Sequence, residues 1–153
     1  MLPGVEQAIA RLNGSGRKVI VVTNQRGIAL GLHSESELNA LHDRLRAHLA
    51  VHGARLDAIY YCPHDNGECH CRKPQTGMFE LAFQDFPEAT AGNSVMVGDS
   101  LVDVEAASRL GMRSVFICDR VVRADSDAAR ALALSTASAE SLADCVGRYF
   151  DEE

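Results

Sequence analysis

Apolar positions fall into two kinds of pattern that alternate along the chain. Four short runs rich in β-branched residues are continuously apolar, as expected for strands buried on both faces of a parallel sheet. These runs span residues 18–23, 58–61, 94–97 and 114–118. Longer segments with apolar residues at helical spacing lie between them. The alternation predicts an α/β fold in which helices flank a parallel sheet.

Helical segments are marked by spacing and by capping residues. A stripe of leucines over 38–49 repeats at helical spacing, and Ser34 with Glu37 has the form of a capping box at its start. Further helical patterns occupy residues 5–12, 101–110 and 140–149. The chain has 153 residues and no internal repeat, so we expect a single domain over 1–153.

Charge and composition narrow the class of partner. The formal net charge is −6 and no segment is dense in lysine or arginine, which argues against a nucleic-acid or anionic-membrane surface. No window has the roughly 18–20 apolar residues of a membrane span, and the N-terminus lacks the pattern of a secretory signal. We therefore expect a cytoplasmic protein that acts on a small metabolite.

Three of the five cysteines lie between residues 62 and 71, unlike the spread framework of a disulfide scaffold. Two ligand pairs flank an Asn-Gly turn in this segment: Cys62, His64, Cys69 and Cys71. Three thiolates and one imidazole form a closed tetrahedral ligand set for zinc, with no open position for a reactive water. The sequence therefore predicts a structural zinc site on the loop 62–71.

Two other interpretations of this loop remain open at this point. The first is a loop of free thiols with a surface histidine. The second is a zinc-ribbon nucleic-acid module, although the ligand pairs of such modules are usually separated by a longer stretch. His70 could replace one cysteine as ligand, but its position between two cysteines favours an outward or substrate-facing side chain.

Polar residues follow the predicted strands, at the sheet edge where α/β proteins bind ligands. Thr23, Asn24, Gln25 and Arg26 follow the first strand and precede a glycine. Their hydroxyl, amide and guanidinium groups are suited to phosphoryl oxygens, although a plain polar turn would also explain them.

Cations and carboxylates follow the next two strands. Arg72 and Lys73 come after the cysteine loop and require an anion nearby. Asp99 and Asp103 are four residues apart at a strand-to-helix turn, a placement that suits Mg²⁺. Asp103 could instead cap the helix or pair with Lys73.

The combined motifs resemble those of the haloacid dehalogenase superfamily of phosphohydrolases. Thr23, then Lys73, then G-D-x-x-x-D from residue 98 follow the order of the superfamily's second to fourth motifs. The segments TNQRGIALG, CPH…CHCRKP and GDSLVDVEAA more closely resemble the D-glycero-D-manno-heptose 1,7-bisphosphate 7-phosphatase group and its relative histidinol-phosphatase. The resemblance extends from about Leu2 to Cys118.

The resemblance implies a Rossmann-like fold, a monomer, and an Mg²⁺-dependent phosphatase of a small sugar phosphate that also carries structural Zn²⁺. It implies that Thr23 and Lys73 hold the phosphoryl group, that Arg72 recognises substrate and that Asp99 binds Mg²⁺, with Asp103 in support. The zinc loop matches the ligand set named above, and residues 24–26 extend the substrate contacts. Ser100 stands where the heptose enzymes often have a lysine, and we expect it to face the substrate.

The family's first motif, D-x-D-G, is absent from this sequence. Its first aspartate would be the nucleophile that forms an aspartyl-phosphate. The resemblance places that motif on a central strand between those that end at Thr23 and Val97. The only D-x-D here, residues 125–127, lacks the glycine and is expected to start a helix.

Three explanations for the absent motif remain open. The first strand could lie upstream of Met1 in an ordinary phosphatase. The chain could instead be a non-catalytic phosphosugar-binding or regulatory relative, or a decayed gene product.

Overall fold

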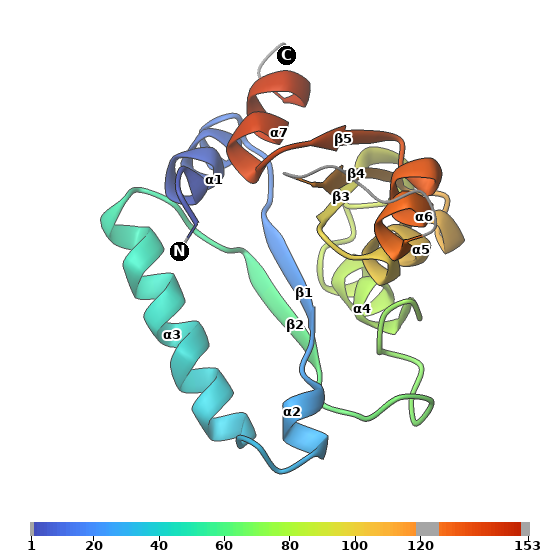
Figure 1. Ribbon diagram of the computed structural model, residues 1–153. Coiled ribbons are helices and arrows are strands. Elements are labelled where there is room, and N and C mark those ends of the chain that lie inside the picture. Colours follow the sequence, from blue (N-terminus) through green and yellow to red (C-terminus); the bar gives the residue numbers. More distant parts are fainter. Residues whose placement is uncertain (1, 119–125, 151–153) are drawn as a thin grey trace.

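A computed structural model describes residues 2–118 and 126–150 of the chain. It confirms the α/β class, with parallel strands and helices alternating along the sequence (Figure 1). The strands are β1 (Ile20–Asn24), β2 (Ala58–Cys62), β3 (Val95–Gly98), β4 (Arg113–Ile117) and β5 (Ala137–Ala139). The helices are α1 (Val5–Gly14), α2 (Arg26–Ala29), α3 (Glu35–Val51), α4 (Gly77–Asp85), α5 (Leu101–Arg109), α6 (Asp127–Leu134) and α7 (Leu142–Tyr149). A short 3₁₀ turn spans Ala91–Asn93.

The strands form two hydrogen-bonded sheets rather than one continuous sheet. β1 pairs in parallel with β2, with Val22 opposite Tyr60. The second sheet has the order β3-β4-β5, also parallel throughout. The alternation of strands and helices predicted the parallel direction, and the family resemblance placed a further strand between β1 and β3, which agrees with their separation into two sheets.

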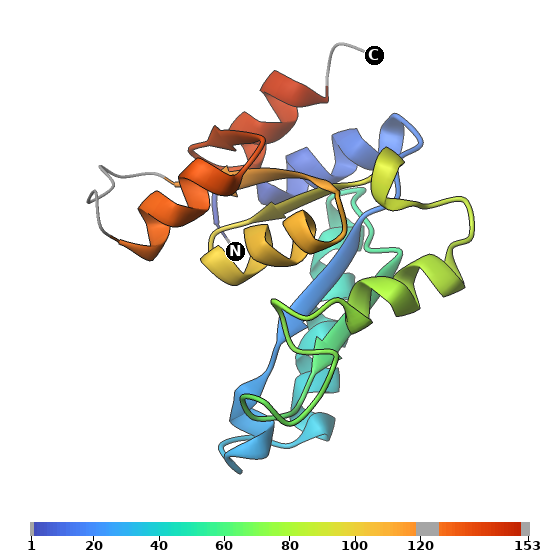
Figure 2. The same cartoon turned by 90° about the vertical axis from the view of Figure 1, so that its right-hand side faces the viewer.

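Helices cover both sheets. α3 runs along β1 and β2, while α5 and α6 lie on one face of the second sheet and α7 lies on the other (Figures 1 and 2). The predicted capping box of α3 is present, because the Ser34 hydroxyl accepts from the Glu37 amide and the Glu37 carboxylate accepts from the Ser34 amide. No helix of the described residues combines the length and apolar character that a bilayer span requires.

Side-chain packing joins the two sheets where backbone pairing does not. Phe79 of α4, Met96 of β3 and Met112 form a buried cluster, and Val22 of β1 packs against it. α4 was not predicted, nor were the four-residue α2 and the three-residue β5. α4 is important for the site because the loop between β2 and α4 carries both the cysteines and Lys73.

Candidate functional site

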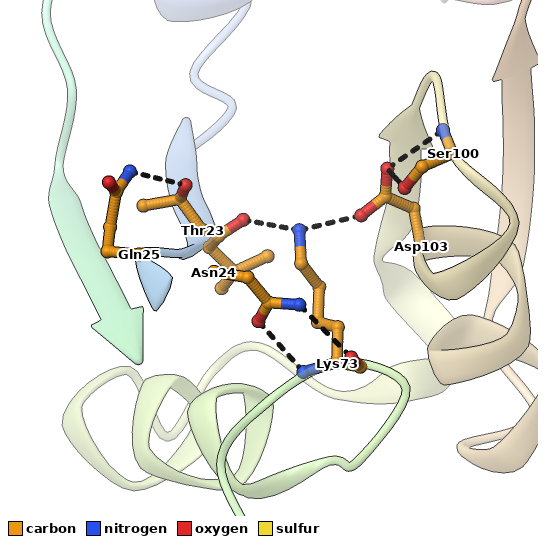
Figure 3. Close-up of polar contacts among 7 residues, drawn as sticks. Thr23, Asn24, Gln25, Lys73, Ser100 and Asp103 are labelled. Atoms are coloured by element: carbon orange, nitrogen blue, oxygen red, sulfur yellow. Dashed lines mark hydrogen bonds and ion pairs between the residues drawn. The ribbon is translucent and has the colours of Figure 1, made fainter. Parts of the chain in front are cut away.

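Lys73 lies where the two sheets meet. Its ammonium donates to the main-chain carbonyl of Val22 at 2.7 Å and lies 2.6 Å from Oδ1 of Asp103 (Figure 3). The side chain is 9% exposed, and that of Asp103 is 6% exposed. A buried ammonium needs an anionic partner, and here the side chain is held in place from two sides.

Asp103 performs both of the structural roles that its sequence position suggested. It occupies the third position of α5, and its Oδ2 accepts from the Ser100 hydroxyl at 2.6 Å and from the Ser100 amide at 3.2 Å. Its Oδ1 faces Lys73. Both carboxylate oxygens are therefore engaged within the protein, and the supporting magnesium role of Asp103 stays a prediction. The Ser100 hydroxyl donates to Asp103, and its predicted contact with substrate stays a prediction.

Gly98 allows this carboxylate to lie against the end of β3. A Cβ atom at position 98 would come within 2.5 Å of the Asp103 Cβ and closer still to its carboxylate. Glycine is required here by close approach rather than by backbone conformation. The next residue, Asp99, is exposed at the carboxyl end of β3. Of the two predicted magnesium ligands, it is the accessible one.

Asn24 and Gln25 have partners within the protein. The Asn24 carboxamide accepts from the Lys73 amide at 2.9 Å and donates to the Lys73 carbonyl at 3.0 Å. Gln25 points away from Lys73 and donates to the Thr23 hydroxyl oxygen at 3.0 Å (Figure 3). A hydroxyl that accepts one hydrogen bond still has its own proton to donate. Thr23 is therefore the strand-end residue best prepared to donate to an anion.

Both predicted arginines contact the cysteine loop. Arg26 forms a two-point ion pair with Asp65, with its second contact at 3.3 Å, and Arg72 donates to the Asn66 side chain at 2.8 Å. The Arg26 guanidinium lowers the pKa of Asp65, mainly through their hydrogen bond. The sequence predicted the Asn66-Gly67 turn, but not that Asp65 and Asn66 would contact the two arginines.

The four predicted zinc ligands converge. Cys71 Sγ lies 3.1 Å from Cys62 Sγ and 3.3 Å from Cys69 Sγ, and His64 Nδ1 lies 3.3 Å from Cys71 Sγ. All four ligand atoms lie within 4.8 Å of one another. This spacing fits an ion bound at about 2.0–2.3 Å from each ligand, so the cluster fits a zinc site. His70 is exposed and outside the cluster, as its position between two cysteines favoured.

Thiol ionisation supports this fit. Burial and contacts with its two neighbours raise the pKa of Cys71 to about 12, and burial raises the pKa of Cys62. At Cys69 burial is outweighed by hydrogen bonds from Cys71 and from backbone amides, which lower the pKa to about 6. Cys69 therefore ionises readily, whereas ionisation of Cys62 and Cys71 is unfavourable. Three adjacent thiolates need a cation between them.

The described part of the D-x-D segment, Ser126 and Asp127, forms the start of α6. Asp125 lies outside the described residues. Ser126 caps α6 by accepting from the Ala129 amide, and Asp127 begins that helix and pairs with Arg130. The expectation that this segment starts a helix is confirmed for Ser126 and Asp127.

The chain is similar in sequence to a family of known hydrolases. The model of the HAD-hydrolase-like family matches residues 70–145. The D-glycero-beta-D-manno-heptose-1,7-bisphosphate 7-phosphatase of Bordetella bronchiseptica is 46% identical over 112 residues, which cover 72% of this chain and 62% of the relative. A Thermoplasma volcanium protein, named probable D-glycero-D-manno-heptose-1,7-bisphosphate 7-phosphatase, is 36% identical over 71% of this chain and 75% of its own length.

Solved structures of the same group of phosphatases resemble the fold of this chain. The crystal structure of D,D-heptose 1,7-bisphosphate phosphatase from B. bronchiseptica, complexed with magnesium and phosphate, superposes with a TM-score of 0.84 at 34% identity. The superposition covers 99% of this chain and 84% of that one. The corresponding enzyme of Burkholderia thailandensis has a TM-score of 0.70 at 29% identity, over 99% of this chain and 86% of that one.

Proposed function

Because the chain belongs to the D-glycero-D-manno-heptose 1,7-bisphosphate 7-phosphatase family of haloacid dehalogenase-like hydrolases, we propose that the protein hydrolyses a phosphomonoester of a small sugar phosphate. The proposed substrate is D-glycero-D-manno-heptose 1,7-bisphosphate, cleaved at the 7-phosphate, and histidinol phosphate is the alternative. The observation that carries the proposal is the buried Lys73 ammonium beside the strand end at Thr23. The chain matches 62% of the length of the Bordetella relative, so the activity of that relative is a proposal for this protein.

The proposed roles follow from the charge and the hydrogen-bond donors that each side chain can present to a ligand. Lys73 supplies a fixed positive charge to the phosphoryl oxygens, and Thr23 donates its hydroxyl proton to one of them. Arg72 directly follows the proposed zinc ligand Cys71 in the sequence, and its proposed role is to bind the part of the substrate beyond the scissile phosphate. The zinc cluster therefore sets the start of the segment that carries both cations.

Asp99 is the proposed Mg²⁺ ligand. Its carboxylate is exposed at the carboxyl end of β3, and carboxylate oxygen is the donor that this cation prefers. Magnesium, when bound there, would neutralise charge on the phosphoryl oxygens. The Bordetella enzyme was solved with magnesium and phosphate, which supports the same chemistry here.

The second candidate function is phosphosugar binding without turnover, in a regulatory relative of these phosphatases. It is favoured by one observation, the absence of D-x-D-G from the sequence. The chemistry of the family needs a carboxylate nucleophile that none of the residues discussed above supplies. Both candidate functions use the same proposed anion-binding residues, Lys73 and Thr23.

Phosphate release and phosphate binding, measured together, separate the two. Release is followed with Mg²⁺ on heptose 1,7-bisphosphate, histidinol phosphate and an aryl phosphate, and binding is followed by calorimetry. Turnover that is lost in Lys73→Met and kept in Lys18→Met supports the phosphatase. Binding without turnover supports the second candidate, and the absence of both contradicts the phosphoryl site itself. The two variants are matched because Lys18 and Lys73 are the only lysines of the chain.

A further inference from the structure

The Asn24 carboxamide uses both of its polar atoms on one residue. Its oxygen accepts from the Lys73 amide at 2.9 Å, and its nitrogen donates to the Lys73 carbonyl at 3.0 Å. The two hydrogen bonds tie the end of β1 to a residue that is 49 positions away in sequence. While they persist, the Asn24 side chain is directed at the protein rather than at a ligand.

A third contact sets the direction of the Lys73 side chain. The Val19 carbonyl accepts from the Asp57 amide on the β2 side, and backbone groups alternate between the two edges of a strand. The Val22 carbonyl therefore faces the other edge, where it accepts from the Lys73 ammonium. The main chain of Lys73 is held by Asn24 and its ammonium by Val22, two residues earlier in β1, so β1 orients both ends of the lysine.

We propose that Asn24 is a positioning residue that acts through Lys73, an inference that rests on the proposed function of Lys73 as the phosphoryl-binding cation. The sequence had suggested a direct contact between Asn24 and substrate. The geometry instead assigns the side chain to holding the loop that carries Lys73 against β1. Loss of the two hydrogen bonds should leave the ammonium chemically intact but less constrained.

The chain offers a matched control in Asn93. Its carboxamide makes the same kind of paired backbone contact, accepting from the Thr90 amide at 2.7 Å and donating to the Glu88 carbonyl at 2.9 Å. Asn93 lies in the 3₁₀ turn before β3, and its hydrogen bonds in the described part of the chain go to Thr90, Glu88 and Ser94 rather than to Lys73. Asn93→Ala therefore removes an equivalent pair of hydrogen bonds away from the cation.

Reductive methylation with ¹³C-formaldehyde tests the inference without any phosphorylated ligand. In the wild-type protein Lys18, which is 39% exposed, should react faster than the 9% exposed Lys73. Asn24→Ala and the nearly isosteric Asn24→Leu should each accelerate Lys73 relative to Lys18 by roughly five- to tenfold, as loss of net hydrogen bonding predicts. An unchanged Lys73 rate in both variants would overturn the inference, and so would an equal acceleration in Asn93→Ala.

Orthophosphate titration with Mg²⁺ then tests whether Asn24 acts only through Lys73. Asn24→Ala should weaken phosphate binding in the wild-type background and cause no further loss in the Lys73→Met background. Losses that multiply would mean that Asn24 touches the anion itself, which contradicts a positioning role. A wild-type protein that binds no phosphate would overturn the proposed function, while the methylation rates would still decide on Asn24.

Discussion

Lys73 and Asp103 form a 2.6 Å ion pair at the junction of the two sheets, with both side chains almost fully buried. The pair joins the loop before α4 to the first turn of α5, and Ser100 holds the carboxylate from the other side. A charge this deeply buried depends on its partner, because neither group can be solvated if the other is removed. Removal of either partner alone should therefore destabilise the fold as well as affect the proposed chemistry.

Asp103→Asn should destabilise the protein by about 3–5 kcal/mol, the range found when one partner of a buried ion pair is removed. Asparagine keeps an oxygen that can accept from Ser100, so the main loss is the charge that faces Lys73. Urea unfolding gives the free energy. The double variant Lys73→Met/Asp103→Asn should recover part of the loss, whereas strictly additive losses would show that the two groups do not interact.

Gly98→Ala should displace the Asp103 carboxylate and cost about 1–3 kcal/mol, as overpacking of a filled site does. The added Cβ would lie 2.5 Å from the Asp103 Cβ, so either Asp103 or the end of β3 must shift. The control is Gly92→Ala, where the nearest atom would be 3.8 Å away. Equal unfolding free energies for the two variants would contradict the packing argument.

Removal of one zinc ligand should release the metal. We expect about one zinc ion per chain by elemental analysis, and loss of that zinc in Cys69→Ser, because a tetrahedral site needs all four ligands. Cys118→Ser is the control, since Cys118 lies outside the cluster. Loss of zinc should also lower the melting temperature, because metal binding contributes to folding. A well-folded wild-type protein without metal would refute the site.

His42 should make the protein less stable in mild acid. Burial, and secondarily the charge of Arg46, lowers its pKa below the usual 6.5, and the ring is 8% exposed beside Tyr61. As pH falls through 6.5 the unfolded chain binds a proton at this residue before the folded chain does, so stability is lost in that direction. Unfolding at pH 7.5 and 5.5 should show a smaller loss in His42→Phe than in wild type. Zinc release affects both proteins alike, so an identical loss would mean that His42 titrates normally.

Local patterns in the sequence were sufficient for several features. The Ser34 and Glu37 capping box depends on residues three apart, and four strands were recognisable from continuous apolar runs. The zinc ligands lie on one short loop, so their convergence needs only a single turn. β5, with its sequence Ala-Ser-Ala, has no pattern to detect, and it is a strand because β4 supplies its hydrogen bonds.

The sequence by itself thus determined the α/β class, the zinc loop and the types of residue at the strand ends. Only the tertiary structure decided which of those residues remain free. Asn24 and Arg26 carry groups suited to a phosphorylated ligand and Asp103 carries one suited to Mg²⁺, yet each is engaged within the protein. The reason is physical: hydrogen bonds and ion pairs need separations near 3 Å, and only the packing of distant elements brings residues that are 30 to 49 positions apart into that range.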